Sequence, residues 1–525
     1  MYQKMKQREN WGSKLGVIFA VAGSAVGLGN FLRFPVQAAR NGGGAFMIPY
    51  FAALIFLGIP LMLIEWTAGR FGGGFGHGTA PGIFHSMWRK NRFIKYFGVI
   101  GIFGPVIIFI YYTYIESWLL GYAFFSLVGK YTPATASMET MKEFLSGYQG
   151  APGNPYFGGL RWAYLFFVLT FTANIVVVYY GIKNGIEKLA KWAMPILFVL
   201  GAIITVRVLT LGVVDLARPE RNPVNGLGFL WNPDFSQLKS AKVWLAAAGQ
   251  VFFTLSVGIG VILTYASYLK KRQDVVLSGI TSAMTNEFIE VVLGASIVIP
   301  AAVTFFGVAG ATEIAGSGSF NLSFVTMPMI FTRIPMGALF AFMWFALLFL
   351  AGITSSVSLA TPAISFLEDE FDISKKDAVM IFAAVTFVLC QPAIFLLGQG
   401  VVDEMDFWGG TFCLVLFAAI EAVLFSWIFG IDKAWDEMHL GADIRVPGFY
   451  RFIIKYITPV LLLTILGAWF YQEGLDVILM KNVAEANRAT VLYTRINLAS
   501  IFVILCVLVR TAWRRREKMT AAGNI

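Results

Sequence analysis

Charge, cysteine and histidine are scarce in this chain of 525 residues. Charged residues make up 13% of it, about half the share of a soluble globular protein, whereas 58% are hydrophobic. The three cysteines stand in apolar runs and the three histidines in predicted loops, which excludes a disulfide framework and a histidine-rich metal site in the membrane. No small-residue cleavage pattern follows the polar N-terminus, so we expect a retained first helix rather than a removed signal peptide.

Apolar segments fill most of the length, and the mean hydropathy is +0.71. At about 20 to 25 residues per crossing, this length accommodates on the order of twelve membrane helices and no large soluble domain. We therefore predict an all-α polytopic membrane protein embedded in a lipid bilayer. The twelve predicted transmembrane helices lie at about 15–41, 44–69, 93–128, 160–182, 190–213, 242–269, 277–309, 337–367, 377–397, 404–430, 452–472 and 491–513.

The net charge of +10 comes from short clusters of Lys and Arg between these segments. Such clusters are typical of loops retained in the cytoplasm, so they favour a membrane topology over a nucleic-acid partner. With an even number of spans, we expect both termini in the cytoplasm and the protein in the plasma (cell inner) membrane. Two long outer loops, 129–159 and 214–241, are expected as surface caps, and 308–336 as a partly buried hairpin or an inert connector.

Two segments interrupt their apolar run with paired glycines. The first contains GSAVGLGN from Gly23 to Asn30, and the sixth contains TLSVGIG from Thr254 to Gly260. Each glycine costs helix stability about 1 kcal/mol relative to alanine, so breaks are expected in helices 1 and 6. Helix packing alone is the alternative for either motif.

The two motifs lie about 230 residues apart in the sequence, which predicts an internal repeat. Because five spans per unit is an odd number, the copies would have opposite orientations in the membrane. We predict one transporter domain, 1–525, with an inverted five-helix repeat in 11–213 and 242–430 and two additional helices in 447–513. Unwound backbone at mid-membrane persists only around a cavity or ligand, and a pair of breaks suits a zwitterion beside Na⁺.

Ten motifs then resemble those of the neurotransmitter:sodium symporter family, with its bacterial leucine-transporter members. They are GSAVGLGNFLRFP from Gly23, NGGGAFMIPY from Asn41, IEW from Ile64, GHGT from Gly76, IYYTYIESW from Ile110, GQVFFTLSVGIG from Gly249, TNE from Thr285, AGITSS from Ala351, FLEDE from Phe366 and DEMDFW from Asp403. The resemblance extends from the first to the tenth span. It implies a symporter rather than an enzyme.

The resemblance implies two sodium ions held by neutral oxygens. The first would contact the substrate carboxylate and bind the carbonyl of Ala25, the amide oxygens of Asn30 and Asn286, and Thr254. The second would bind the carbonyls of Gly23, Val26 and Ala351 and the hydroxyls of Thr354 and Ser355. Without the family, each hydroxyl would be read as bonding its own preceding helical turn.

The resemblance also places a substrate site between the two breaks. It comprises Ala25, Leu28, Gly29, Ile108, Tyr112, Phe253, Thr254, Ser256, Ile259, Ser355 and Leu359. Its apolar lining implies a hydrophobic amino acid. Amine-carrying members have an aspartate where this chain has Gly27, so the glycine favours a substrate with its own carboxylate. Ile108, Ile259 and Ser24 depart from the leucine transporter, which leaves the preferred amino acid open.

Two ion pairs are implied as gates, with purely structural pairs as the alternative. Arg33 and Asp406 would close the outer side, and Arg8 and Asp369, buttressed by Ser267 and Tyr268, the inner side. Glu290 stands where chloride-dependent relatives have a neutral residue. A built-in carboxylate there implies transport that is independent of chloride, while a proton counter-transported by Glu290 stays open.

The sequence therefore predicts a sodium-coupled symporter that imports hydrophobic amino acids by alternating access. A sodium-coupled transporter of betaine or an amine is the alternative, and an ion channel a more distant one, because two broken helices and two gates suit a closed cycle better than an open pore. An enzyme within the membrane would need a nucleophile and a base there, and no histidine serves. The sodium stoichiometry and a homodimer stay open.

Overall fold

The computed structural model describes residues 9–233 and 235–521, and helices make up most of both ranges. The first half contains α1 (Lys14–Ala25), α2 (Phe34–Arg40), α3 (Gly44–Ala53), α4 (Ile59–Gly73), α5 (Ala80–Met87), α6 (Ile94–Phe97), α7 (Ile100–Val128), α8 (Met138–Tyr148), α9 (Arg161–Tyr179), α10 (Glu187–Leu209), α11 (Pro223–Trp231), α12 (Ala241–Thr254) and α13 (Val261–Ala266).

The second half contains α14 (Val276–Glu287), α15 (Ala295–Gly316), α16 (Ser319–Asn321), α17 (Met327–Phe331), α18 (Gly337–Phe371), α19 (Lys375–Phe395), α20 (Val401–Met405), α21 (Cys413–Val423), α22 (Ile431–Met438), α23 (Phe449–Phe452), α24 (Thr458–Trp469), α25 (Leu475–Ile478) and α26 (Arg488–Ala521). Wide helical turns join several of these helices into longer spans, such as Gly44–Gly73 from α3 and α4.

Within the described residues, ten continuous spans are long and apolar enough to cross a membrane. The bent pair Lys14–Ala25 and Gly29–Arg40 makes an eleventh. At the predicted sixth span, α12 and α13 have 14 and 6 residues, each too short for a crossing by itself. The all-α polytopic fold is therefore confirmed, and the count of twelve depends on taking each broken pair as one span.

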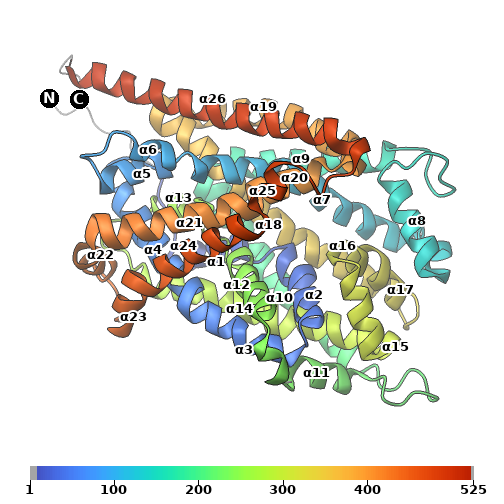
Figure 1. Cartoon of the computed structure of the whole chain (residues 1–525). Helices are drawn as coiled ribbons and strands as arrows, with labels where there is room; N and C mark the ends of the chain where they lie inside the picture. The colour runs from blue at the N-terminus through green and yellow to red at the C-terminus, as the bar shows by residue number, and fades with distance from the viewer. Residues whose placement is uncertain (1–8, 234, 522–525) are drawn as a thin grey trace.

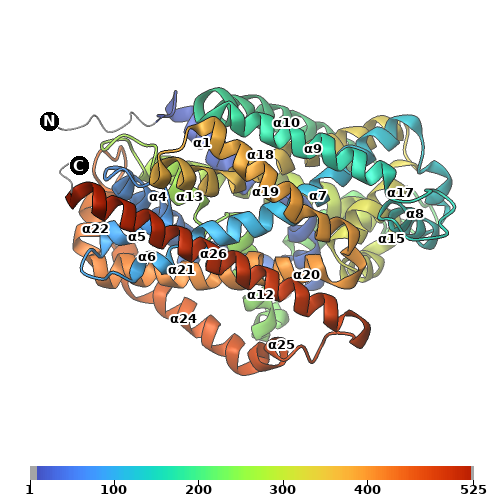
Figure 2. The same cartoon turned by 90° about the horizontal axis from the view of Figure 1, so that it is seen from above.

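The spans form an elongated bundle with the described chain ends at one end, called here the terminal end (Figures 1 and 2). Helices α8 and α17 lie at the opposite end. At the centre, α7 packs along α18 and also contacts α9. Helix α26 runs along the outside, where apolar side chains such as Val503, Ile504 and Val507 are exposed. Such a surface is suited to the hydrocarbon of a bilayer rather than to water.

Both predicted breaks are present. Helix α1 ends at Ala25, and the chain turns by 47° before it becomes helical again at Gly29. Helix α12 ends at Thr254, and left-handed backbone at Ser256, Gly258 and Gly260, with φ of 53°, 77° and 80°, separates it from α13. A Cβ on Gly258 would lie 2.5 Å from the carbonyl oxygen of Leu414, so this position requires glycine for space as well as for φ.

The segment predicted as a hairpin at 308–336 is helical for much of its length. Helix α15 kinks at Gly307, where φ is 72°, and runs on to Gly316. The chain then returns through α16, a wide helical turn and α17, and the apolar residues Phe324 and Val325 of the turn and Met327 of α17 are buried. The outer segments 129–159 and 214–241 carry the short helices α8 and α11. A partly buried hairpin is therefore present at this place.

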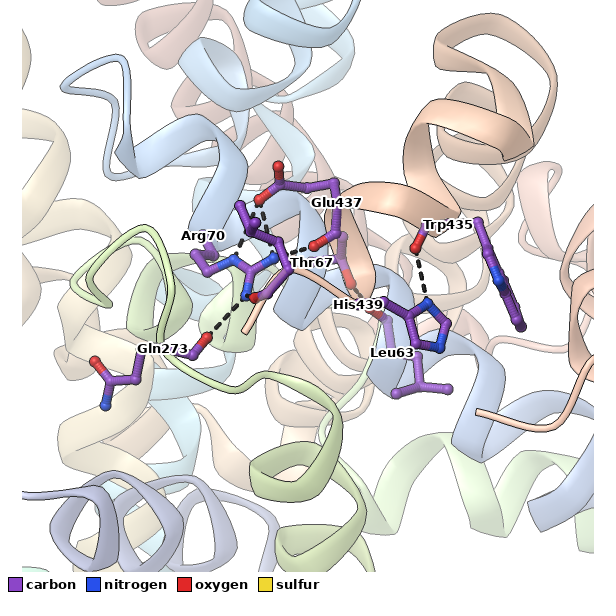
Figure 3. Close-up of polar contacts among 8 residues, drawn as sticks. Leu63, Thr67, Arg70, Gln273, Trp435, Glu437 and His439 are labelled. Carbon is purple, nitrogen blue, oxygen red and sulfur yellow. Dashed lines mark hydrogen bonds and ion pairs between the residues drawn. The ribbon is translucent and has the colours of Figure 1, made fainter. Parts of the chain in front are cut away.

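A buried arginine joins several helices at the terminal end. Arg70, on α4, is 2% exposed and donates to the carbonyl oxygens of Gln273, at 2.8 Å, and Leu440, at 2.7 Å. It also pairs with the carboxylate and main chain of Glu437 on α22 (Figure 3). Because arginine has five N–H donors in a rigid fork, one side chain can link α4, the loop after α13 and the end of α22.

Candidate functional site: a cavity between two broken helices

A cavity lies where the two broken helices meet α7 and α18. All eleven residues predicted for the substrate site line it: Ala25, Leu28, Gly29, Ile108, Tyr112, Phe253, Thr254, Ser256, Ile259, Ser355 and Leu359. The remaining lining comes from Ser24, Gly27, Tyr111, Ser358, Gly410 and Leu414. The structure therefore brings the predicted residues together in one place, while their roles in binding stay a prediction.

The breaks leave peptide groups that side chains of the same span and of other helices satisfy. The amide of Gly27 donates to the Asn30 side-chain oxygen at 2.8 Å, and the amide of Leu28 to the Tyr112 hydroxyl at 3.3 Å. The amide of Gly258 donates to the buried carboxylate of Glu65 at 2.5 Å. Because a buried polar group without a partner costs about 1 to 3 kcal/mol, these bonds stabilise the unwound conformation in an apolar setting.

The predicted ligands of the first sodium ion converge beside the cavity. The Asn30 amide nitrogen donates to the Asn286 side-chain oxygen at 2.8 Å and to the Thr254 hydroxyl at 3.1 Å. All three side chains are almost fully buried. The Asn286 amide nitrogen also donates to the Thr254 hydroxyl, at 3.0 Å, and the Asn30 side-chain oxygen accepts from Gly27, so two amide groups satisfy the oxygens of this cluster. Oxygen ligands suit a hard cation, and Na⁺ binding here, with the Asn30 oxygen as a ligand, stays a prediction.

The predicted ligands of the second ion converge between α1 and α18. The Ser355 hydroxyl lies 3.2 Å from the carbonyl oxygens of Val26 and Ala351 and 3.4 Å from that of Gly23. The carbonyl of Ser24 is 3.1 Å away. One hydroxyl proton can serve only one of these four acceptors. The carbonyl of Ser24 also accepts from the Ser256 hydroxyl at 3.0 Å, and that of Ala351 accepts from Thr354. The Thr354 hydroxyl donates to the carbonyls of Leu350 and Ala351 in its own helix. This is the bonding expected of such a hydroxyl when it holds no ion.

Glu290 belongs to the same polar cluster as the first set of ligands. It is fully buried, and it accepts hydrogen bonds from Gln250 at 2.6 Å, from Asn30 at 3.3 Å and from the hydroxyl of Thr254. A second carboxylate, Glu287, accepts from Tyr50 at 2.6 Å. A buried carboxyl group thus stands next to the first predicted cation site, and its use in place of chloride stays a prediction.

The predicted outer gate residues lie near the cavity with different partners. The Arg33 guanidinium stacks on the ring of Phe253, 4.2 Å from its centroid. Asp406 accepts a hydrogen bond from Tyr111 at 2.6 Å. No Arg33–Asp406 ion pair occurs among the described residues, so the structure places the two residues beside the same cavity without joining them. Their closing together stays a prediction.

The predicted inner gate is described only in part, because Arg8 lies outside the described residues. Tyr268 bonds Ser365 on α18 at 2.7 Å, and Ser267 donates to the carbonyl of Thr264 at 2.6 Å. Ser267 and Tyr268 therefore lie directly after α13, and Tyr268 contacts α18 there. Asp369 stands one turn beyond Ser365 on α18.

Nearby contacts fasten the beginning of the described chain to this end. Trp11 donates to the carbonyl of Tyr265 at 3.0 Å, and Lys14 pairs with Asp443 at 2.6 Å. The beginning of α1 is therefore tied to α13 and to the segment that follows α22.

Several residues of the site were not predicted from the sequence. Tyr111, Gly410 and Leu414 line the cavity, and Glu65 holds the second break. Gly410 follows Gly409 in the tenth span, so this glycine pair is a signal for close approach that sequence reading could have used. Glu65 is a charged residue within a predicted membrane span, and such residues are costly unless they are paired or functional. This property could have identified Glu65 from the sequence.

Comparisons with known proteins agree with this architecture. The family model described as the sodium:neurotransmitter symporter family matches residues 8–147 and 153–515. An uncharacterized sodium-dependent transporter of Methanocaldococcus jannaschii is 31% identical over 462 residues, 87% of this chain and 89% of the relative. The sodium- and chloride-dependent glycine transporter 2 of Xenopus laevis is 26% identical over 89% of this chain and 65% of the relative.

Among solved structures, the crystal structure of MhsT in complex with L-phenylalanine is similar, with a TM-score of 0.73 and 31% identity. The similarity covers 87% of this chain and 98% of that one. Because the family model matches nearly the whole sequence, the chain belongs to the sodium:neurotransmitter symporter family and is a sodium-dependent, multi-pass membrane transporter.

Proposed function

We propose that this transporter couples two sodium ions to the uptake of a hydrophobic amino acid, without a requirement for chloride. The observation that carries the proposal is the pair of oxygen clusters on either side of one cavity, the first around Asn30 and the second around Ser355. The ligands proposed for both ions are neutral oxygens, and the Glu290 carboxyl group bonds two of the first set, Asn30 and Thr254. A substrate carboxylate can offset the charge of the bound ions that these groups leave unbalanced.

The polar end of the cavity suits the carboxylate of the substrate. The Tyr112 hydroxyl and the unwound backbone at Leu28 lie there, and Gly27 leaves the adjoining space open. A Cβ at Gly27 would come within 2.9 Å of the Ser355 hydroxyl oxygen and 3.1 Å of that of Tyr112. A larger side chain, such as the aspartate of amine carriers, would therefore fill the room that a carboxylate needs.

The rest of the cavity suits an apolar side chain. Ile108, Ile259, Leu359 and Leu414 line it, and the aromatic rings of Tyr111 and Phe253 complete it. A hydrophobic pocket gains roughly 25 cal/mol for each Å² of apolar surface removed from water, so branched or aromatic amino acids should bind better than alanine. The similar structure of MhsT, which contains L-phenylalanine, supports this choice of substrate class.

Chloride independence rests on Glu290. Its buried carboxylate contacts Asn30, Thr254 and Gln250, the same groups that adjoin the first cation site. When it is ionised beside a bound cation, this carboxylate balances the charge without an anion from solution.

The transport cycle that we propose is alternating access. Sodium and amino acid enter from the outer side, Arg33 and Asp406 close above them, and the bundle of spans one, two, six and seven rocks against the rest of the molecule. The terminal end, where Lys14 and Arg70 fasten α1 and α4, then opens to release both. In this proposal the terminal end faces the cytoplasm across the plasma membrane.

Uptake by proteoliposomes tests the proposal. Purified protein is reconstituted, and radiolabelled leucine uptake is measured with sodium or potassium outside and with chloride replaced by gluconate. Unlabelled alanine, leucine, methionine, phenylalanine, tyrosine, tryptophan, betaine and an amine are the competitors. We expect uptake that needs sodium, persists in gluconate and is inhibited by the larger apolar amino acids. Inhibition by betaine or the amine alone would contradict the substrate class.

A further inference from the structure

The C-terminal part of α26 contacts the part of α18 that carries the predicted inner gate residue Asp369. Trp513 of α26 is buried, and its indole ring stacks on His77 with a centroid separation of 5.9 Å and an interplanar angle of 4°. The Lys95 ammonium lies 5.0 Å from the same ring. These contacts hold the end of α26 against the segments on either side of α5.

One turn further, Arg516 contacts a carboxylate that is buried. Its Nε lies 2.9 Å from Glu370, whose side chain has no exposed surface, and its Nη2 donates to the main-chain carbonyl of Asp369 at 3.3 Å. The other oxygen of Glu370 lies 3.0 Å from His77 Nδ1. Arg516 therefore links α26 to the end of α18 and, through His77, to the chain that follows α4.

Because α18 is one continuous helix, a contact at its end can affect the position of residues further along it. The same helix carries Ser355 in the second cation cluster, Leu359 in the cavity wall, and Asp369 near its end. At 1.5 Å per residue, Asp369 stands about 15 Å along the helix axis from Leu359. Displacement of the end of α18 would therefore change the path between the cavity and the terminal end.

A second cavity marks that path. It is lined by residues of α18, of the segment after α13, of the α9–α10 connection and of the start of α19, including Thr361, Ser365, Tyr268 and Lys375. Thr361 is almost fully buried there, two residues beyond Leu359. The accessibility of position 361 to a reagent in water therefore indicates whether the terminal end is closed.

We propose that Arg516 is a positioning residue of the inner gate: by holding Glu370, it fixes the end of α18 on which Asp369 stands and keeps the terminal end closed. The proposal rests on the transport cycle proposed above, and it assigns a role in that cycle to the last helix. Removing one partner of a buried ion pair is destabilising, and loss of Arg516 would leave His77 as the remaining partner of Glu370 among the described residues. Loss of Arg516 should therefore displace Glu370 toward water.

The test uses Thr361→Cys as a reporter, in the full chain with Cys390, Cys413 and Cys506 replaced by alanine. The rate of alkylation by a membrane-impermeant maleimide is measured on purified protein in sodium. Arg516→Ala should label about tenfold faster, because the closed state loses a charged contact, and Arg516→Lys should be intermediate. Arg514→Ala is the matched control, since Arg514 is exposed two residues away and its loss changes the net charge equally.

Equal labelling rates in Arg516→Ala and Arg514→Ala would overturn the proposal. If Arg516→Ala fails to fold, Glu370→Gln replaces it, because the amide keeps the shape of the side chain and removes the charge that Arg516 holds. Faster labelling in Glu370→Gln supports the proposal, and an unchanged rate overturns it. The labelling assay needs no substrate, so loss of the proposed amino-acid uptake would leave its result standing.

A second readout separates gating from general damage. We expect Arg516→Ala to raise the KM for external amino acid about tenfold while kcat changes less, because fewer molecules hold the outward-facing, binding-competent state. Arg516→Lys should recover most of that loss. An equal fall of kcat in both Arg516 variants with an unchanged KM would contradict a positioning role.

Discussion

Replacing Gly27 by alanine tests the polar end of the cavity by adding a single carbon. The new Cβ would lie 2.9 Å from Ser355 Oγ and 3.1 Å from Tyr112 Oη, closer than ordinary van der Waals contact, so both hydroxyls must move. A hydrogen bond to a charged group contributes about 1.5 to 3 kcal/mol. At about 1.4 kcal/mol per factor of ten, displacing the Tyr112 hydroxyl from a substrate carboxylate weakens binding by roughly 10- to 150-fold.

Equilibrium binding of radiolabelled leucine to purified protein in saturating sodium measures this change. Gly398→Ala is the matched control, because its added Cβ would meet no atom within 4 Å. We expect the Kd to rise in Gly27→Ala and to stay at the wild-type value in Gly398→Ala. An unchanged Kd in folded Gly27→Ala would refute the placement of the carboxylate beside Tyr112.

Three further predictions concern other parts of the molecule. Glu290→Ser should make uptake depend on chloride, with about tenfold less uptake in gluconate than in chloride, and equal uptake in both anions would count against the role of this carboxylate. Ser355→Ala should lower the Hill coefficient for sodium from about 2 toward 1 in binding assays, and an unchanged coefficient would contradict the placement of the second sodium ion at Ser355. Hydrogen bonding and charge attraction from Lys14 lower the pKa of Asp443 below its usual 3.8, so this contact adds stability above that pH and loses it as the pH falls through the lower pKa of the folded state. The melting temperature of Asp443→Asn should therefore lie below that of the wild type near neutral pH and match it in strong acid, and a difference that persists in acid would contradict the pairing.

The breaks were predictable because their cause is local. Gly27 and Gly29, and Gly258 and Gly260, stand in the middle of apolar runs, and glycine at such positions disfavours a continuous helix. The kink at Gly307 was not predicted, since a single glycine there carries no such pattern. The wall of the cavity was predicted through the family motifs rather than from periodicity, and all eleven of the named residues line it.

Contacts between distant segments could not be read from one sequence. Glu65 and Gly258 are 193 residues apart, and nothing in the spacing of either motif indicates that the carboxylate of one satisfies the amide of the other. Likewise, sequence motifs suggested Arg33 and Asp406 as partners, whereas the structure gives Arg33 the ring of Phe253 and gives Asp406 the hydroxyl of Tyr111. The partner of a charged side chain depends on tertiary packing and on the state of the transport cycle, neither of which is local.

Sodium-stimulated binding of leucine to purified protein tests most directly whether the two breaks hold cation and substrate together. The variants are Asn30→Ala and Thr254→Ala, with Asn497→Ala and Thr464→Ala as controls, because Thr464 is exposed, Asn497 is half-buried, and each donates to a carbonyl of its own helix far from the cavity. We expect sodium to increase binding in the wild type and both controls and to have no effect in Asn30→Ala and Thr254→Ala. Stimulation by sodium that survives in both site variants would contradict this site.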